Sequence, residues 1–252
     1  MARKVSVPLI SLLALLLLTC GDPVPLTLTI GSGPIALVQN GPLVIGNYKG
    51  VSPTLATPST AGTTLVAILI GDLVTAVPPG WVLAATATSG GVLVFQTYIY
   101  PNNPGGILTA NFTVATVVST TDAHISEWSG VQYVLPLETS GTATATAGTT
   151  LTPTAAAAIA NPGDLVIAAW GQALSGAGTV TFTTPAGFTR LKDNGSSSVQ
   201  GHDDIEYMLA PSVGQIMAPV LTSTGTTVFA AGAVIVLKRA PQAVDMTAFI
   251  AY

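Results

Sequence analysis

The chain has 252 residues, of which 49% are hydrophobic and only 7% are charged, and its formal net charge is −4. Without a basic field to hold a phosphate backbone, we expect no nucleic-acid partner. A single cysteine excludes an intrachain disulfide framework and a cysteine-rich metal site, and the scarcity of Lys, Glu and Arg argues against a helical bundle.

The N-terminus has the pattern of a targeting segment. Arg3 and Lys4 precede an uncharged, leucine-rich run from Val5 to Thr19. This pattern is typical of a secretory signal and is short for a membrane-spanning helix. The alternative is an apolar arm buried against a neighbouring molecule. Cys20 resembles the acylated cysteine of a bacterial lipoprotein signal, although Thr19 stands where that signal prefers Gly, Ala or Ser. We expect membrane contact only through a lipid anchor at Cys20.

From residue 23 onward the sequence indicates strands separated by turns. Residues 65–70 and 165–170 are continuous apolar runs, which suit strands buried on both faces. Residues 92–100 are rich in β-branched and aromatic side chains. Clusters of Gly, Pro and Asn, as at 101–106 and 161–163, mark turns between such runs. The pattern predicts an all-β, antiparallel fold.

The order of these features recurs in the second half of the chain. Each half has a continuous apolar strand, then a Gly-aromatic step (Gly80-Trp81 and Gly187-Phe188), then a strand closed by a proline. The spacing of roughly 100–110 residues is too long for a solenoid unit and fits sandwich-sized modules. We predict two tandem antiparallel β-sandwich modules of the jelly-roll or Ig-like type; the alternative is one larger sandwich in which each half contributes a sheet. The expected segments are 1–22 (signal-like or buried apolar arm), 23–54 (N-terminal extended arm), 55–137 (first module), 138–153 (linker), 154–241 (second module) and 242–252 (C-terminal tail).

A weak family resemblance rests on this repeated pattern. Its parts are Gly-x-Leu-Val with four apolar residues, Pro-x-Gly-(Trp/Phe), an aromatic strand and Glu-Trp-Ser-Gly-Val at 127–131. Over about residues 55–240 this resembles tandem β-sandwich modules of secreted bacterial surface proteins and of phage tail or head-surface proteins. The resemblance implies a non-catalytic accessory module and supplies no catalytic residues.

Few polar residues suggest chemistry. His124 and Glu127 stand three apart in an expected strand, so they would point to opposite faces, one inward and one exposed, and form no acid–base pair. Asp193, Asp203 and Asp204 are weak candidates for Ca²⁺, which prefers oxygen ligands, but they lack the spacing of a known calcium loop and favour a solvated loop. Without a nucleophile, phosphate, dinucleotide or zinc motif, we predict no catalytic residue and no cofactor.

The aromatic residues divide into two groups. Trp81 and Trp170 are expected in the core. Tyr100 and Tyr133 lie at strand ends beside turn sequences, where we expect exposure, and they are the candidates for ligand contact, for instance with a glycan.

The low charge is the most informative feature. Between Lys49 and Asp122 the only charged residue is Asp72. A free monomer normally uses charges to stay soluble and to protect its edge strands, so we expect a surface covered by other copies, as a homo-oligomer or lattice, or by other surface or capsid proteins. The leading interpretation is an extracellular structural or adhesive protein, on a virion as a decoration or tail protein or on a bacterial cell envelope. The alternatives are a carbohydrate-binding module and a secreted glycoside hydrolase-like enzyme.

Overall fold

The computed structural model describes residues 33–46, 49–115, 121–174, 178–194, 196–197 and 201–241. Within these ranges every regular element is a strand, which confirms the all-β class. The same ranges contain no helix of the length and apolar character needed to cross a membrane. Cys20, the apolar N-terminal segment and the tail 242–252 lie outside the described residues.

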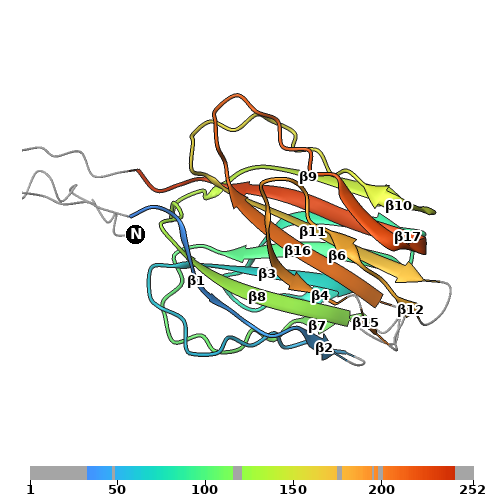
Figure 1. The fold of residues 1–252 in the computed structure, drawn as a ribbon. Helices are drawn as coiled ribbons and strands as arrows, with labels where there is room; N and C mark the ends of the chain where they lie inside the picture. Colours follow the sequence, from blue (N-terminus) through green and yellow to red (C-terminus); the bar gives the residue numbers. More distant parts are fainter. Residues whose placement is uncertain are drawn as a thin grey trace, which may run out of the picture. The chain divides into compact units, whose positions relative to one another are not determined.

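The first sheet is built from the first half of the chain (Figure 1). Its strands in spatial order are β1 (Ala36–Asn40), β8 (Thr121–Ser129), β3 (Thr64–Gly71), β6 (Leu93–Tyr100) and β5 (Val82–Ser89), with β2 (Val44–Gly46) also on β8. All pairs are antiparallel. A separate small ribbon joins β4 (Val74–Ala76) to β7 (Thr113–Val114). Residues 36–46, expected to belong to an extended arm, are therefore part of this sheet.

The second sheet is built from the second half. Its strands in spatial order are β10 (Gly148–Leu151), β17 (Leu221–Leu237), β11 (Leu165–Leu174), β16 (Gly201–Leu209) and β14 (Thr189–Asp193), with β9 (Leu137–Ala145) and β13 (Phe182–Thr183) also on β17. β12 (Gly178–Thr179) and β15 (Ser196–Ser197) form a separate ribbon. The expected linker at 138–153 was wrong, because it contains β9 and β10. Its alternating Thr and Ala residues have the period of two that suits a strand with one covered face.

The two sheets repeat one topology. The order β8–β3–β6–β5 in the first corresponds to β17–β11–β16–β14 in the second, and β1 and β9 occupy corresponding edges. The two sheets also contact each other through corresponding strands. At one side β5 of the first sheet lies against β9 of the second. At the other side their counterparts meet, because Nδ2 of Asn40 in β1 donates to the carbonyl of Leu191 in β14 (2.8 Å). The sheets are therefore related by an approximate twofold axis.

A shared core joins the halves. Val66, Ile68 and Phe95 of the first sheet belong to the same buried cluster as Ile167 and Ile205 of the second. Residues 32–241 accordingly form one compact unit. The described residues do not form two complete sandwiches at 55–137 and 154–241. Instead, each half supplies one sheet of a common sandwich-like body. The physical reason is that one sheet leaves an apolar face that must be covered by a second layer.

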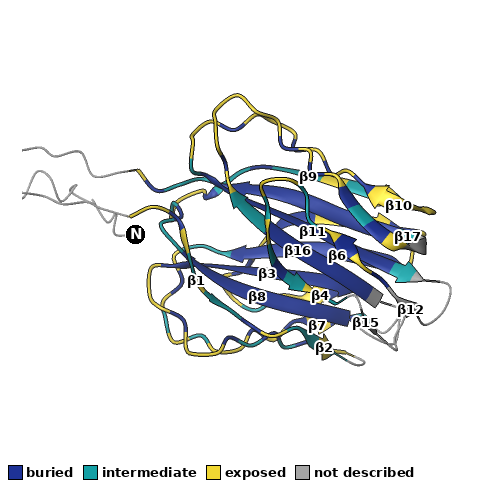
Figure 2. Cartoon of the chain, in the orientation of Figure 1, coloured by how far each residue is buried: buried dark blue, intermediate teal, exposed yellow. Residues whose placement is uncertain are grey.

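The outer faces are covered as well. Val51, Leu55 and Phe112, from irregular segments, pack on the outer face of the first sheet, and Ile159 and Met217 do so on the second. Every residue of β3 is buried, and the central strands are buried along most of their described length (Figure 2). Burial on both faces explains the continuous apolar runs in the sequence.

Candidate functional site

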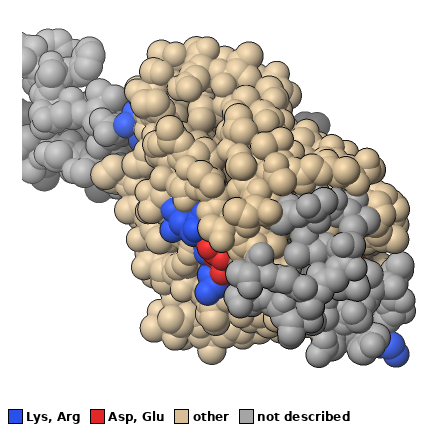
Figure 3. Space-filling model, turned by 45° about the vertical axis from the view of Figure 1, so that its right-hand side comes forward, with Lys and Arg blue, Asp and Glu red and all other residues tan. Residues whose placement is uncertain are grey.

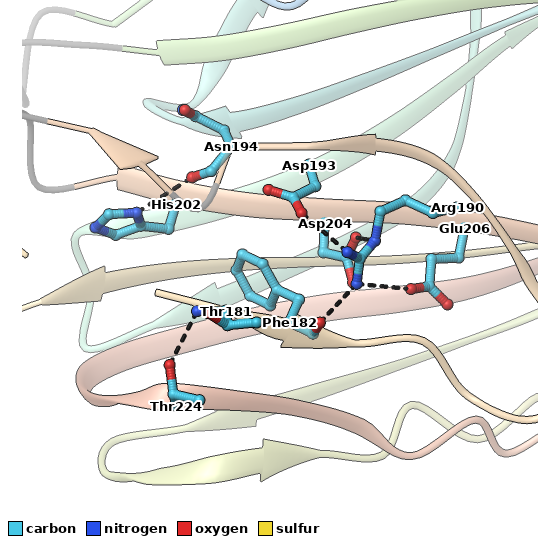
Figure 4. Close-up of polar contacts among 9 residues, drawn as sticks. All are labelled: Thr181, Phe182, Arg190, Asp193, Asn194, His202, Asp204, Glu206 and Thr224. Carbon is cyan, nitrogen blue, oxygen red and sulfur yellow. Dashed lines mark hydrogen bonds and ion pairs between the residues drawn. The ribbon is translucent and has the colours of Figure 1, made fainter. Parts of the chain in front are cut away.

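One polar cluster lies on the outer face of the second sheet, around Arg190 of β14 (Figure 4). Its guanidinium Nη1 lies 3.0 Å from Oδ2 of Asp193, and its Nε lies 3.0 Å from Oδ1 of Asp204. Its Nη2 donates to the carbonyl of Phe182 (2.7 Å) and lies 3.5 Å from Oε1 of Glu206. Asp204 and Glu206 stand two apart on β16, so both reach the same face.

The charge balance of the Arg190 cluster is unusual. Burial raises the pKa of Asp204 to about 8, and the Glu206 carboxylate pushes it the same way, against the attraction of Arg190. The contact with Arg190 therefore does not offset the cost of burying the Asp204 carboxylate beside Glu206. Asp204 and Glu206 are both fully enclosed, so this cluster contributes to the packing of the second sheet.

The candidate Ca²⁺ residues do not form one site. Asp203 and Asp204 are neighbours on β16 and therefore point to opposite faces of the sheet. Asp204 reaches Arg190, whereas Asp203 shares the inward face with Ile205 of the common core. Both are 1% exposed, so the solvated loop expected there is also wrong. In the described part of the chain no three His, Cys, Asp or Glu side chains are placed to hold a metal ion.

A second polar cluster lies between the sheets, where β8 faces β14 and β16. We call it the polar flank; its members are Asn40, Asp122, His124, Lys192, Asn194 and Asp203. Nδ2 of Asn194 donates to Oδ2 of Asp122 (3.2 Å), and Nε2 of His124 contacts Oδ1 of Asn40. Nδ1 of His124 and both carboxyl oxygens of Asp203 are buried and have no hydrogen-bond partner among the described residues.

Burial dominates the titration of the polar flank. It raises the pKa of Asp122 to about 6, partly offset by the hydrogen bond from Asn194. It lowers the pKa of His124 to about 3, with the charge of Lys192 acting in the same direction. It also raises the pKa of Asp203 well above the ordinary value, helped by the nearby charge of Asp122. Each shift has the sign expected when a charged form loses water.

His124 and Glu127 do point to opposite faces, as predicted. His124 faces the polar flank, whereas Glu127 faces the loop before β3. Glu127 is buried, so the expectation that one of the two would be exposed was wrong. Its Oε1 accepts from the backbone N of Thr60 (2.7 Å) and from Oγ1 of Thr63 (2.8 Å). Glu127 thus anchors a turn, a role that depends on a contact across more than sixty residues and has no local sequence signal.

The tyrosines differ in accessibility. Tyr100 is half-buried, and its ring lies 5.7 Å from that of Trp81, centroid to centroid. A Cβ at Gly80 would lie 2.3 Å from the Tyr100 ring, so this tyrosine packs tightly and its expected exposure was wrong. Tyr133 is 59% exposed, as expected. Trp81 and Trp170 are buried, which confirms their assignment to the core.

Tyr133 belongs to an apolar loop that the strand and turn patterns of the sequence do not predict. The apolar loop consists of Tyr133, Val134 and Leu135, all exposed, with Leu135 at 78%. Its two ends are held on the second sheet: the backbone N of Gln132 donates to the carbonyl of Lys238 (2.9 Å), and the Lys238 N donates to that of Pro136 (2.8 Å). Leu135 has φ of 51°, a conformation that few non-glycine residues adopt.

An open apolar groove of about 930 Å³ lies elsewhere on the second sheet's side of the molecule. Phe188, Met208, Leu209, Ile216 and Met217 are among its lining residues. Leu209 and Ile216 are also exposed to solvent.

Most acidic residues are hidden inside. Nine of the eleven carboxylate residues lie in the described ranges, and seven of these nine are buried. The seven are Asp72, Asp122, Glu127, Asp164, Asp203, Asp204 and Glu206. The face in Figure 3 is accordingly poor in charged side chains: it shows one small group of both signs and isolated basic side chains near its edges. In the described ranges this leaves two acidic residues, Glu138 and Asp193, that are not buried, beside five basic residues, none of which is buried.

Comparison with known proteins gives no assignment. No family model matches the chain, and neither a curated protein nor a solved structure matches it. The resemblance to surface-protein modules therefore stays a prediction.

Proposed function

We propose that this protein is a non-catalytic structural or adhesive protein that assembles with copies of itself on an exterior surface, either of a virion or of a bacterial cell. The observation that supports this proposal most directly is the burial of seven of the nine described carboxylates, which leaves few charged side chains on the described part of the surface. Charged side chains normally keep a free protein soluble and monomeric. A surface with few of them is suited to contact with other protein surfaces.

The exposed apolar side chains support the same proposal. The apolar loop presents three consecutive large side chains on a backbone fixed at both ends. Such pre-ordered apolar groups lose little conformational entropy when they bind, which favours association. Exposed apolar patches on soluble proteins commonly mark interaction sites.

Sedimentation velocity of the full chain at micromolar concentration tests the proposal. We expect discrete assemblies larger than the monomer that persist at high salt, because contacts between uncharged surfaces are not screened. A stable monomer across the micromolar range would contradict the proposal.

Matched lysine variants test the apolar loop. Leu135→Lys should shift the distribution toward monomers, because it places a charge in an apolar contact. Thr149→Lys adds the same charge at an exposed residue of β10 and should leave the assembly unchanged. Equal effects of the two variants would assign the change to net charge and remove the loop from the interface.

Mass spectrometry of the native protein distinguishes the two exterior surfaces. An intact N-terminus at Met1 favours assembly into a virion, whereas acylated Cys20 favours a cell-envelope lipoprotein. A glycan-array signal that is lost in Tyr133→Ala would instead favour the carbohydrate-binding alternative.

A further inference from the structure

Because the two sheets repeat one topology, residues of the polar flank can be compared with their counterparts at the opposite side of the molecule. Leu93 and Asp203 correspond, because each lies eight residues before the proline that follows its strand. From these two positions the strand registers give the remaining pairs. Asp122 corresponds to Ala233, His124 to Ile235, Lys192 to Ala87, and Asp203 to Leu93.

The corresponding flank is thus entirely apolar at these positions. Ala87, Leu93, Ala233 and Ile235 all belong to the common buried core. We call them the apolar flank. The same fold therefore closes one flank with apolar side chains and the other with titratable ones. The fold itself does not require Asp122 or Asp203, although burying each costs free energy whenever its carboxyl is charged.

The surroundings of Asp203 add a second, independent observation. Both of its carboxyl oxygens are enclosed and lack a hydrogen-bond partner among the described residues. The charge of Asp122 acts on it unfavourably, and the side chain of Asn194 and the charge of Lys192 offset this only in part. A buried carboxylate without a partner is stable when it is protonated, or when its surroundings open to water.

We propose that the polar flank is a proton-operated seam: it is closed while Asp122 and Asp203 are protonated, and it opens locally between β8 and the β14–β16 pair when they ionise. This inference does not depend on self-assembly. It concerns the contact between the two sheets within one chain.

The titratable and charged groups around the seam come from three strands. β8 contributes Asp122 and His124, β16 contributes Asp203, and β14 contributes Lys192 and Asp193, whose charges both act on Asp203. β1 and the residue after β14 contribute only the neutral amides of Asn40 and Asn194. β3 faces the seam with Ile68 and Ile70.

As the pH rises, the two carboxyls and His124 change the stability of the closed state in opposite directions. Because the pKa of Asp122 is raised in the closed state to about 6, its contribution is present at low pH and is lost as the pH rises through that value. Asp203, whose pKa is also raised, acts in the same direction. The lowered pKa of His124 acts oppositely, since its contribution is present above pH 6.5 and is lost as the pH falls toward about 3. Single Asp→Asn variants separate these effects, because His124 is common to variant and wild type.

Hydrogen exchange of the full chain, corrected for intrinsic exchange rates, measures the opening strand by strand. Between pH 5 and pH 8 the opening constant of β14 in the wild type should rise about tenfold relative to Asp122→Asn, from the raised pKa of that one group. Asp203→Asn should suppress the opening at least as strongly. The apolar flank, measured on β5, which carries no titratable side chain, should show no such rise.

Two further variants keep the test decisive. Asp193→Asn removes a partly exposed carboxyl whose charge is a minor cause of the raised pKa of Asp203, so it should reduce the response of β14 by less than Asp203→Asn does. Asp203→Leu copies the apolar flank and should abolish the response even if an asparagine is poorly accommodated. Equal pH dependence on both flanks, or an unaltered response in both Asp203 variants, would overturn the proposal.

Discussion

The direct contact between the two sheets can be tested at Gly171, on the inward face of β11. A Cβ at this position would lie 2.3 Å from Cγ2 of Ile70, on β3 of the opposite sheet, and 3.2 Å from its Cγ1 and Cδ1. Gly171→Ala therefore forces the sheets apart or displaces Ile70. Overpacking of this kind costs about 1–3 kcal/mol of unfolding free energy.

A double-mutant cycle turns this clash into a measurement. Ile70→Ala alone should cost about 3 kcal/mol, because it leaves a cavity in the shared core. It also removes all three atoms that the new methyl group would meet, so the double variant should be more stable than the sum of the two losses predicts, by about 1–3 kcal/mol.

Urea denaturation followed by tryptophan fluorescence and far-ultraviolet circular dichroism supplies the free energies. Ile159→Ala, in the cluster on the outer face of the second sheet, is the control partner. Combined with Gly171→Ala it should give additive losses. Additive losses for the Gly171 and Ile70 pair would refute direct contact of the sheets, because residues in separate sandwiches would not couple.

Three further predictions concern cooperativity and the buried carboxyls. Unfolding of residues 32–241 should be a single transition that fluorescence and circular dichroism report at the same urea concentration, since both halves share one core; two resolved transitions would contradict this. Asp204→Asn should raise the urea midpoint relative to wild type clearly more at pH 8 than at pH 4, because the contribution of Asp204 is lost progressively as the pH rises from its ordinary pKa of 3.8 to the raised pKa of about 8; an equal effect at both pH values would show that its ionisation is unimportant. Glu127→Gln should lower stability by about 2 kcal/mol, measured by thermal unfolding, because it weakens the charge-assisted hydrogen bonds from Thr60 and Thr63; an unchanged midpoint would mean that the turn holds without them.

Some features of the candidate sites could be predicted from local sequence and some could not. The opposite directions of His124 and Glu127 follow from the period of two in a strand. The burial of Glu127 does not, because the turn that covers it lies more than sixty residues earlier in the chain. The same holds for Asp122 and Asn194, which are brought together from different halves of the molecule.

The sequence by itself determined the all-β class, the repeat and the core positions of Trp81 and Trp170, because alternation, turn residues and apolar runs are local properties. Only the tertiary structure decided which surface each sheet covers. The continuous apolar runs are equally compatible with two sandwiches and with one, since burial on both faces does not specify the covering layer. Here the inner faces cover each other and irregular segments cover the outer ones. That arrangement also buries seven of the nine described carboxylates and leaves few charged side chains on the described surface.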